Sequence, residues 1–177
     1  MACATYIKED DFKMTMNEKR MKQYPDTKYF KYFNANPKGR ITTDCVIRAV
    51  AKGLGITWEV AFDKLSAIAR KDGYTITSRQ CFDKLLKKEG WVRMKQPKHD
   101  DGTKVTCEEL IDYYSQFAGE VRIIASVGTH HINCIVNANE HTHGKREYKV
   151  HDIWNSSNEK VGVYYISSST VIEYYDS

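Results

Sequence analysis

The stretch Thr42–Ala51, TTDCVIRAVA, decides the fold because it has the pattern of a helix start with a cysteine at the first helical position. Thr43 and Asp44 are both good helix-capping residues, since their side-chain oxygens accept hydrogen bonds from the unpaired amides of the first turn. Four apolar residues follow at helical spacing: Val46, Ala49, Val50 and Leu54. Gly53 and Gly55 then provide the stop. We therefore predict a helix that begins at the cysteine and buries one apolar face.

The position of Cys45 suits it for nucleophilic catalysis. A thiol at a helix N-terminus lies at the positive end of the helix dipole, which favours the thiolate over the thiol. Several unrelated enzymes prepare a cysteine nucleophile in this way. The alternative is structural, because free cysteines are often buried as small apolar residues. A base and an orienting acid elsewhere in the chain would favour the catalytic interpretation.

Length and composition indicate one globular domain with a terminal extension. Hydrophobic residues make up 41% of the 177 residues, which is enough for a core. The chain start lacks a signal peptide's apolar stretch and no run could span a bilayer, so we expect a cytoplasmic protein without a membrane partner. The five cysteines contain no CxxC pair, which excludes a zinc-finger pattern and a disulfide framework. The net charge of +4 is mild and no nucleic-acid-binding motif accompanies it.

The periodicity changes from helical to extended after Gly119. Residues 1–33 are predicted to form an extension, with a short helix over 10–21 and an aromatic arm over 24–33 that packs on the core. Further helices are predicted over 58–70, 79–89 and from a capping box at Thr106 and Glu109. An exposed, mobile loop is predicted over 91–104. Strands are predicted over 121–127, 131–137, 147–153 and 161–167, with a fifth over 170–174.

Helices followed by strands in one chain of this size indicate an α+β fold. We expect residues 34–177 to form one domain, in which the N-terminal helices pack on one face of a C-terminal antiparallel sheet. The short connections between strands favour a meander.

Two predicted strands carry polar residues that can meet. If residues 131–137 and 147–153 form a hairpin centred near residues 141–142, His131 lies directly opposite Asp152, with Cβ atoms about 4.5–5.5 Å apart. His130 would then point to the opposite face, so the register decides between the two histidines. A cysteine, a histidine and a carboxylate are the nucleophile, base and orienting group of a catalytic triad. The alternative is a surface contact worth well under about 1 kcal/mol.

The motifs that carry this arrangement resemble a known family. NANPKGRITTDCVIRAVAKGLGITW, THHINCIVNA and HDIWNSS look like segments of the papain-like cysteine peptidase-type domains of bacteriophage and prophage genomes. The resemblance covers roughly residues 34–166. It implies a papain-like fold in which Cys45 is the nucleophile, His131 the base and Asp152 the third member. Residues 1–33 have no counterpart in that family, and His130 duplicates the base.

Other residues complete or compete with this site. An oxyanion hole needs the Cys45 amide and a side-chain donor. The candidate donors are Asn36, Asn34 and the hydroxyls of Thr42 and Thr43, and of these we select Asn36. Asn155 is an alternative third member, and Trp154 shares the face of Asp152 and could shield it from water. His141 and His143 have a spacing that can chelate zinc or copper, but they fall at an expected loop tip without further ligands, so we predict no metal and no cofactor.

Two classes of function follow from these residues. The first is a thiol protease-like hydrolase, a peptidase or isopeptidase that acts on a protein or peptide through a thioester acyl-enzyme. The same triad would also serve a deamidase or an acyltransferase. The second is a catalytically silent phage accessory protein that captures a host protein through the aromatic arm and residues 91–104. Replacing Cys45 by alanine separates the two, because only the enzyme needs the thiol.

Overall fold

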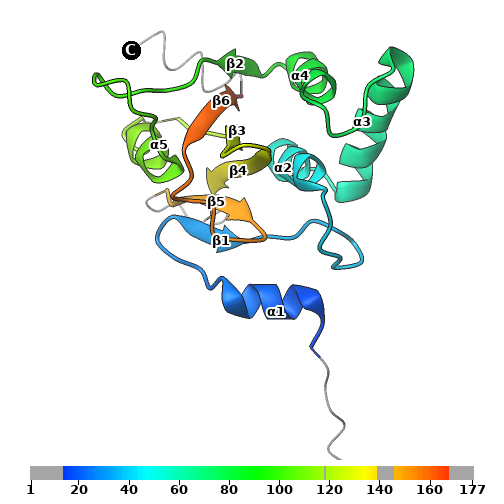
Figure 1. Cartoon of the computed structure of the whole chain (residues 1–177), viewed down its shortest axis with the longest axis horizontal. Coiled ribbons are helices and arrows are strands. Elements are labelled where there is room, and N and C mark those ends of the chain that lie inside the picture. The colour runs from blue at the N-terminus through cyan, green and yellow to red at the C-terminus, as the bar shows by residue number, and fades with distance from the viewer. Residues whose placement is uncertain (1–13, 118, 139–145, 168–177) are drawn as a thin grey trace, which may run out of the picture.

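The structure is a computed structural model that describes residues 14–117, 119–138 and 146–167. Within these residues the chain forms five helices and a six-stranded mixed sheet, which confirms the α+β class (Figure 1). The helices are α1 (Met16–Gln23), α2 (Cys45–Leu54), α3 (Trp58–Asp72), α4 (Arg79–Lys88) and α5 (Cys107–Tyr114). The strands are β1 (Phe30–Tyr32), β2 (Val92–Met94), β3 (Ile123–Val127), β4 (His131–Asn137), β5 (Tyr148–Asp152) and β6 (Val161–Ile166). The strand predicted over 170–174 lies outside the described residues.

Capping side chains set the predicted helix starts. The Thr57 side chain accepts a hydrogen bond from the amide of Val60 at the start of α3. The Ser78 side chain accepts one from the amide of Cys81 at the start of α4. At α5, Thr106 and Glu109 form the predicted capping box, in which each side chain accepts from the other residue's backbone amide. These helix starts are confirmed because the capping signal is local and needs no tertiary partner.

The strand order is β1-β5-β4-β3-β6-β2, so the predicted antiparallel meander is wrong. Strand β6 pairs with β3 rather than with β5, and β1 pairs with β5 in parallel. Four of the five residues of β3 are buried. A strand buried in this way needs a neighbour on each edge, and β4 and β6 provide them.

The sequence did not predict the two short edge strands, β1 and β2. Val92–Met94 pair with β6 within the segment that we predicted to be an exposed loop, and the Trp91 side chain next to them is buried. Phe30–Tyr32 form the opposite edge, within the segment that we predicted to be an extension. Three residues are too few for an alternating pattern to be recognised, and only a partner strand makes them extended.

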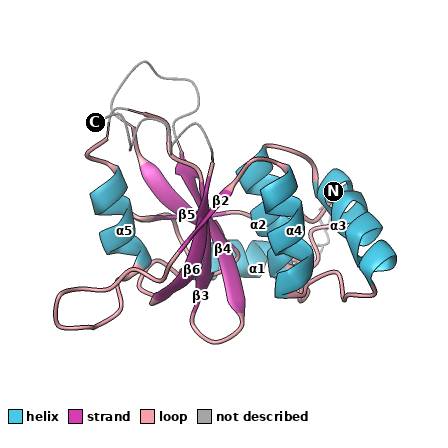
Figure 2. Cartoon of the chain, turned by 90° about the horizontal axis from the view of Figure 1, so that it is seen from above, coloured by secondary structure: helices cyan, strands magenta, loops and turns pink. Residues whose placement is uncertain are grey.

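Helices cover both faces of the sheet: the early helices lie on one face, as predicted, and α5 adds a layer on the other face that we did not predict (Figure 2). Helices α2, α3 and α4 pack on one face, together with sheet residues such as Ile124 and Cys134. Helix α5 packs on the other face against Ile123 and Ile135. The neighbouring residues of β3 and β4 are apolar on both faces, and each face therefore needs its own layer of helix.

The cysteine-bearing helix α2 lies very close to the sheet at Gly53. A Cβ atom added to this residue would lie 2.7 Å from Cδ1 of Ile124, inside van der Waals contact. The helix ends at Leu54, and Gly55 adopts the left-handed conformation that closes it, with φ of 67°. The absence of a side chain at position 53 allows α2 to pack closely against β3 and β4.

The N-terminal segment joins the body through few contacts. None of the residues of α1 is buried, and the helix lies outside the rest of the chain (Figure 1). The Oδ1 atom of Asn17 accepts hydrogen bonds from the Tyr32 hydroxyl, at 2.9 Å, and from Nδ2 of Asn34, at 2.8 Å. Phe30 in β1 is fully buried, so this residue of the aromatic arm packs in the core as predicted. None of the described helices has the length and apolarity needed to cross a bilayer.

Candidate active site

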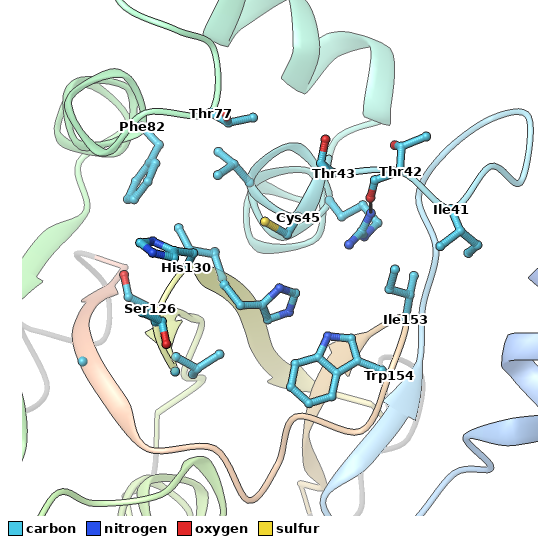
Figure 3. A pocket seen from close by; sticks show the side chains of 18 of the residues that line it. Ile41, Thr42, Thr43, Cys45, Thr77, Phe82, Ser126, His130, Ile153 and Trp154 are labelled. Atoms are coloured by element: carbon cyan, nitrogen blue, oxygen red, sulfur yellow. Dashed lines mark hydrogen bonds between the residues drawn. The ribbon is translucent and has the colours of Figure 1, made fainter.

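A cavity of about 950 Å³ opens at the N-terminal end of α2. The Cys45 sulfur points into it, as Figure 3 shows, with Thr42 and Thr43 on the loop before the helix. The cavity is also lined by His130, His131, Ile153 and Trp154. The predicted nucleophile and both histidine candidates therefore share one cavity.

His131 and Asp152 are in contact, although not through the register that we predicted. The Nε2 atom of His131 lies 2.5 Å from Oδ2 of Asp152. In the observed register Ile135 pairs with Val150 and Cys134 with His151, which is a shift of two residues from the prediction. A shift of two keeps every side chain on its face, so Asp152 reaches His131 diagonally instead of directly. The error arose because the prediction placed the centre of the hairpin about one residue too early in the chain, whereas Asn137 pairs with Tyr148.

Cys45, the first residue of α2, and His131, the first residue of β4, are close enough to shift each other's pKa. Burial raises the pKa of the Cys45 thiol, but the interaction with His131, together with the amides of Ile132 and Val46, lowers that pKa more. Burial lowers the pKa of His131, but Asp152 and Cys45 outweigh it and raise that pKa to about 9. Both shifts favour a thiolate–imidazolium pair over the neutral thiol and imidazole.

Asp152 is held by a network that the sequence analysis did not find. Its Oδ1 atom accepts from the amide of Ile153 at 2.8 Å, and its Oδ2 atom accepts from the hydroxyl of Ser156 at 2.8 Å. The Ser156 hydroxyl accepts in turn from Nδ2 of Asn133 at 3.0 Å. Asp152, Ser156 and Asn133 are all buried. One signal in the sequence could have revealed this network: Asn133 is the only polar amide in the otherwise apolar stretch 132–136, INCIV.

Trp154 packs against the base as the sequence suggested. Its ring centroid lies 5.2 Å from that of His131, with the two planes inclined by 52°. Both residues line the cavity. The indole therefore covers one side of the imidazole and keeps water away from its bond to Asp152.

The alternative triad members occupy other positions. His130 is exposed in the turn before β4 and lines the cavity, whereas His131 is the histidine that contacts Asp152 and lowers the pKa of Cys45. The Oδ1 atom of Asn155 accepts from the amide of Ser157 at 3.1 Å and stabilises the turn there. The structure therefore brings together Cys45, His131 and Asp152, and not His130 or Asn155.

Asp44 occupies the cap position of α2, but its side chain does not cap the helix as predicted. The carboxylate is buried, pairs with Arg48 one turn later and accepts from Nε1 of Trp58 at 2.9 Å. A buried guanidinium needs a counter-charge more than the first turn needs a cap. The capping prediction failed because it considered only the first-turn amides, and not the Arg48 and Trp58 side chains, as partners of Asp44.

Asn36, the selected oxyanion donor, is engaged elsewhere. Its Nδ2 atom donates to Asp44 at 3.4 Å, and its Oδ1 atom accepts from the amides of Lys38 and Arg40. Asn36 is also absent from the described residues that line the cavity, so the structure does not place it in an oxyanion hole. The amide of Cys45 remains a suitable donor, because the first amides of a helix have no partner within it.

The metal site considered from the sequence is centred on residues that the structure does not describe. His141 and His143 lie outside the described residues. His151 is buried, where its Nδ1 atom lies 3.0 Å from the carbonyl oxygen of Lys149. Across residues 14–117, 119–138 and 146–167, no group of three or more His, Cys, Asp or Glu side chains could hold a metal ion.

Comparison of the chain with protein-family models, with curated proteins and with solved structures gave no match. A function for this chain is therefore argued from the geometry of the cavity.

Proposed function

We propose that this chain is a cysteine-dependent hydrolase of the papain-like type, related to the peptidase-like domains of bacteriophages and acting in the cytoplasm of a bacterial host. One observation carries the proposal: a half-buried cysteine shares a cavity with a histidine that lowers its pKa, and this histidine lies 2.5 Å from a buried carboxylate. The order of these residues along the chain, Cys45, His131 and Asp152, is that of papain-like enzymes. The position of the cysteine at a helix start and of its partners on neighbouring strands supports the same assignment.

Each member of the triad has a defined chemical role. The Cys45 thiolate attacks the carbonyl carbon of an amide, and the oxyanion that forms accepts from the Cys45 amide. Protonated His131 then donates its proton to the leaving amine as the C–N bond breaks, which leaves a thioester on Cys45. Neutral His131 next takes a proton from water, the water oxygen attacks the thioester, and the C–S bond breaks to regenerate the pair.

Asp152 is a positioning residue in this scheme. Its bond to Nε2 fixes the orientation of the His131 ring and leaves the other ring nitrogen for Cys45. The carboxylate also stabilises the imidazolium, which is why the pKa of His131 is raised to about 9 despite burial. Ser156 and the Ile153 amide hold the carboxylate in place.

The proposal is tested by acyl-enzyme formation with p-nitrophenyl acetate, a substrate that needs no specific binding. We expect a burst of p-nitrophenolate and a mass increase of one acetyl group on Cys45. The burst should be absent in Cys45→Ala and in His131→Ala. His130→Ala is the matched control, since His130 lines the same cavity but contacts neither partner.

The fate of the acyl group separates the related activities. Loss of the acetyl group to water supports a hydrolase, and faster loss to an added primary amine would point to an acyltransferase. Release of ammonia from glutamine side chains of a test protein would point to a deamidase. A folded protein that gives no burst in the wild type would contradict the catalytic proposal and leave a binding protein on the same fold.

A further inference from the structure

The cavity around Cys45 is positively charged. Arg20 of α1 and Arg79 of α4 line it, as does His130. Among the described residues that line it there is no aspartate or glutamate. Arg48 also reaches the cavity, but its charge is matched by Asp44. The positive charge of the two outer arginines is therefore left for a ligand.

The two arginines have little else to bind. Within the part of the chain that the structure describes, neither Arg20 nor Arg79 forms an ion pair. The guanidinium carbon of Arg20 lies 5.8 Å from the ring centroid of Tyr24, which lines the cavity too. The charge of Arg79 lowers the pKa of Asp83, although burial dominates and raises that pKa overall. Asp83 itself accepts a hydrogen bond from the Tyr165 hydroxyl, on the core side of α4.

The helices that carry the two arginines lie on opposite sides of the cysteine-bearing helix. Helix α1 lies at one end of the molecule and α4 at the other, with α2 between them (Figure 1). Because Cys45 is the first residue of α2, a chain that crosses the cavity from α1 to α4 passes the thiol between the two helices that carry the arginines. An extended chain advances about 3.3 Å per residue, so the charged contacts fall on residues before and after the attacked bond.

We propose that Arg20 and Arg79 are specificity residues, and that the substrate is an extended polypeptide segment with acidic side chains on both sides of the bond attacked by Cys45. This inference rests on the proposed function, since it concerns the substrate of the same site. Arginine suits this role because its planar guanidinium binds a carboxylate through two parallel hydrogen bonds. A polypeptide fits better than a nucleic acid, because its backbone supplies the amide carbonyl that a thiolate attacks.

The first test compares iodoacetate with iodoacetamide, which differ in charge but hardly in size. Both alkylate Cys45 by displacing iodide with the thiolate. The ratio of the iodoacetate rate to the iodoacetamide rate therefore reports the charge of the cavity. At low ionic strength we expect Arg20→Gln and Arg79→Gln each to lower this ratio by about two- to fivefold. Arg70→Gln, an exposed arginine outside the cavity, is the matched control and should leave it unchanged.

The second test uses peptides that carry an electrophile at one end. A chloromethyl ketone at the C-terminus of Glu-Glu-Gly places the glutamates on one side of the thiol, and a chloroacetyl group on Glu-Glu-amide places them on the other. In each case the thiolate displaces chloride. We expect both to react at least about tenfold faster than their glutamine counterparts. Arg20→Gln should slow mainly one probe and Arg79→Gln mainly the other.

The outcomes separate this inference from the function on which it rests. A fast reaction of Cys45 with iodoacetamide, with no preference for acidic probes and no effect of either arginine, would refute the substrate class and leave the hydrolase standing. A Cys45 no more reactive than Cys81 would overturn both. Protection of Cys45 by a single-stranded oligonucleotide, without protection by an acidic peptide, would replace the polypeptide with a nucleic acid. Unchanged thermal unfolding of the variants shows that they remain folded.

Discussion

The carboxylate of Asp152 reaches His131 diagonally across two neighbouring strands, with 2.5 Å between Oδ2 and Nε2. The side chain of Asp152 is almost fully buried, with 2% of its surface exposed, whereas that of His131 keeps 21% exposed. The last pair of β4 and β5 joins Cys134 to His151, and the next residue of β4, Asn133, supports the acid through Ser156. The acid is thus fixed from two sides, while the histidine stays open to the cavity.

Replacing Asp152 by asparagine should disable catalysis while preserving the fold. Asparagine can hold the ring, but it does not stabilise the imidazolium, so the pKa of His131 should fall from about 9 toward its ordinary value of 6.5. We expect the acylation rate to fall by about 10³- to 10⁴-fold. The pKa is measured from the imidazole proton resonances, and burst kinetics give the rate. An unchanged His131 pKa would contradict the assigned contact.

The same variant should change how stability depends on pH. A folded-state pKa of about 9 against 6.5 in the unfolded chain means that protonated His131 stabilises the fold. This stabilisation is fully present below about pH 6.5 and is lost as the pH rises through about 9. The difference in unfolding free energy between wild type and Asp152→Asn should therefore shrink between these limits. Urea denaturation at pH 6, 7.5 and 9.5 measures it.

Ser156→Ala tests how much the hydrogen bonds that hold Asp152 contribute to stability and to the acylation rate. The substitution removes a hydrogen bond to a buried carboxylate and leaves Nδ2 of Asn133 with one acceptor fewer. We expect a loss of about 1–3 kcal/mol in unfolding free energy and a moderate fall in acylation rate. Because Ser156 touches no reacting atom, Ser156→Thr or Ser156→Cys should recover part of the rate. A larger effect than that of Asp152→Asn would contradict the positioning role.

Asp44→Asn should destabilise the protein strongly, because it removes the carboxylate that pairs with the buried Arg48 guanidinium. The side chains of this pair are only about 5% exposed, and Asp44 also accepts from the Trp58 indole. Breaking such a pair costs about 3–5 kcal/mol. Asp63→Asn, at an exposed position of α3, is the control and should change the urea midpoint little. An apolar double replacement of the pair should be less harmful than the single change.

Gly53→Ala tests the close approach of α2 to the sheet. Alanine favours a helix over glycine by about 1 kcal/mol, but its Cβ would lie 2.7 Å from Cδ1 of Ile124. We expect overpacking to dominate, with a net loss of about 1–3 kcal/mol. Adding Ile124→Val removes the nearest atom and should recover part of this loss in a double-mutant cycle. A stabilised Gly53→Ala variant would show that the helix can move away freely.

The four described cysteines should differ sharply in reactivity toward iodoacetamide. The pKa of Cys45 is lowered, because its contacts with His131 and the nearby amides outweigh the effect of burial. Burial raises the pKa of Cys81, and it raises those of Cys107 and Cys134 to about 12. At pH 7 we expect Cys45 to be labelled at least about 100-fold faster than these three. Digestion and mass analysis locate the label.

Local sequence signals predicted most of the helices and strands. They failed for segments whose structure depends on residues far away in the sequence. The capped helices and the four main strands were predicted because capping residues and hydrophobic periodicity can both be recognised within a short stretch of sequence. Strands β1 and β2 were missed because each is extended only through its pairing with β5 or β6. The placement of β6 beside β3 also depends on the burial of β3, which no local pattern contains.

The same division applies to the site. Cys45, His131 and Asp152 were found because each lies at the start or end of a predicted element. The error of two residues in the register did not matter for His131 and Asp152, because such a shift keeps each strand side chain on the same face of the sheet. The role of Asp44 was missed because its partners, Arg48 and Trp58, lie on two different helices. Arg20 was missed because nothing in the sequence shows that the N-terminal helix borders the cavity.

The pairing of β1 with β5 governs when this site can exist during synthesis. The amide of Phe33 donates to the carbonyl oxygen of Asp152 at 2.8 Å, and Lys31 lies beside His151, so the edge of the sheet joins segments about 120 positions apart. Contacts of such long range form late in folding. A nascent chain exposes its thiol long before the ribosome has made the acid. Cys45, His131 and Asp152 can therefore come together only after Asp152 has been synthesised, so an enzyme of the proposed type would become active late in the synthesis of this domain.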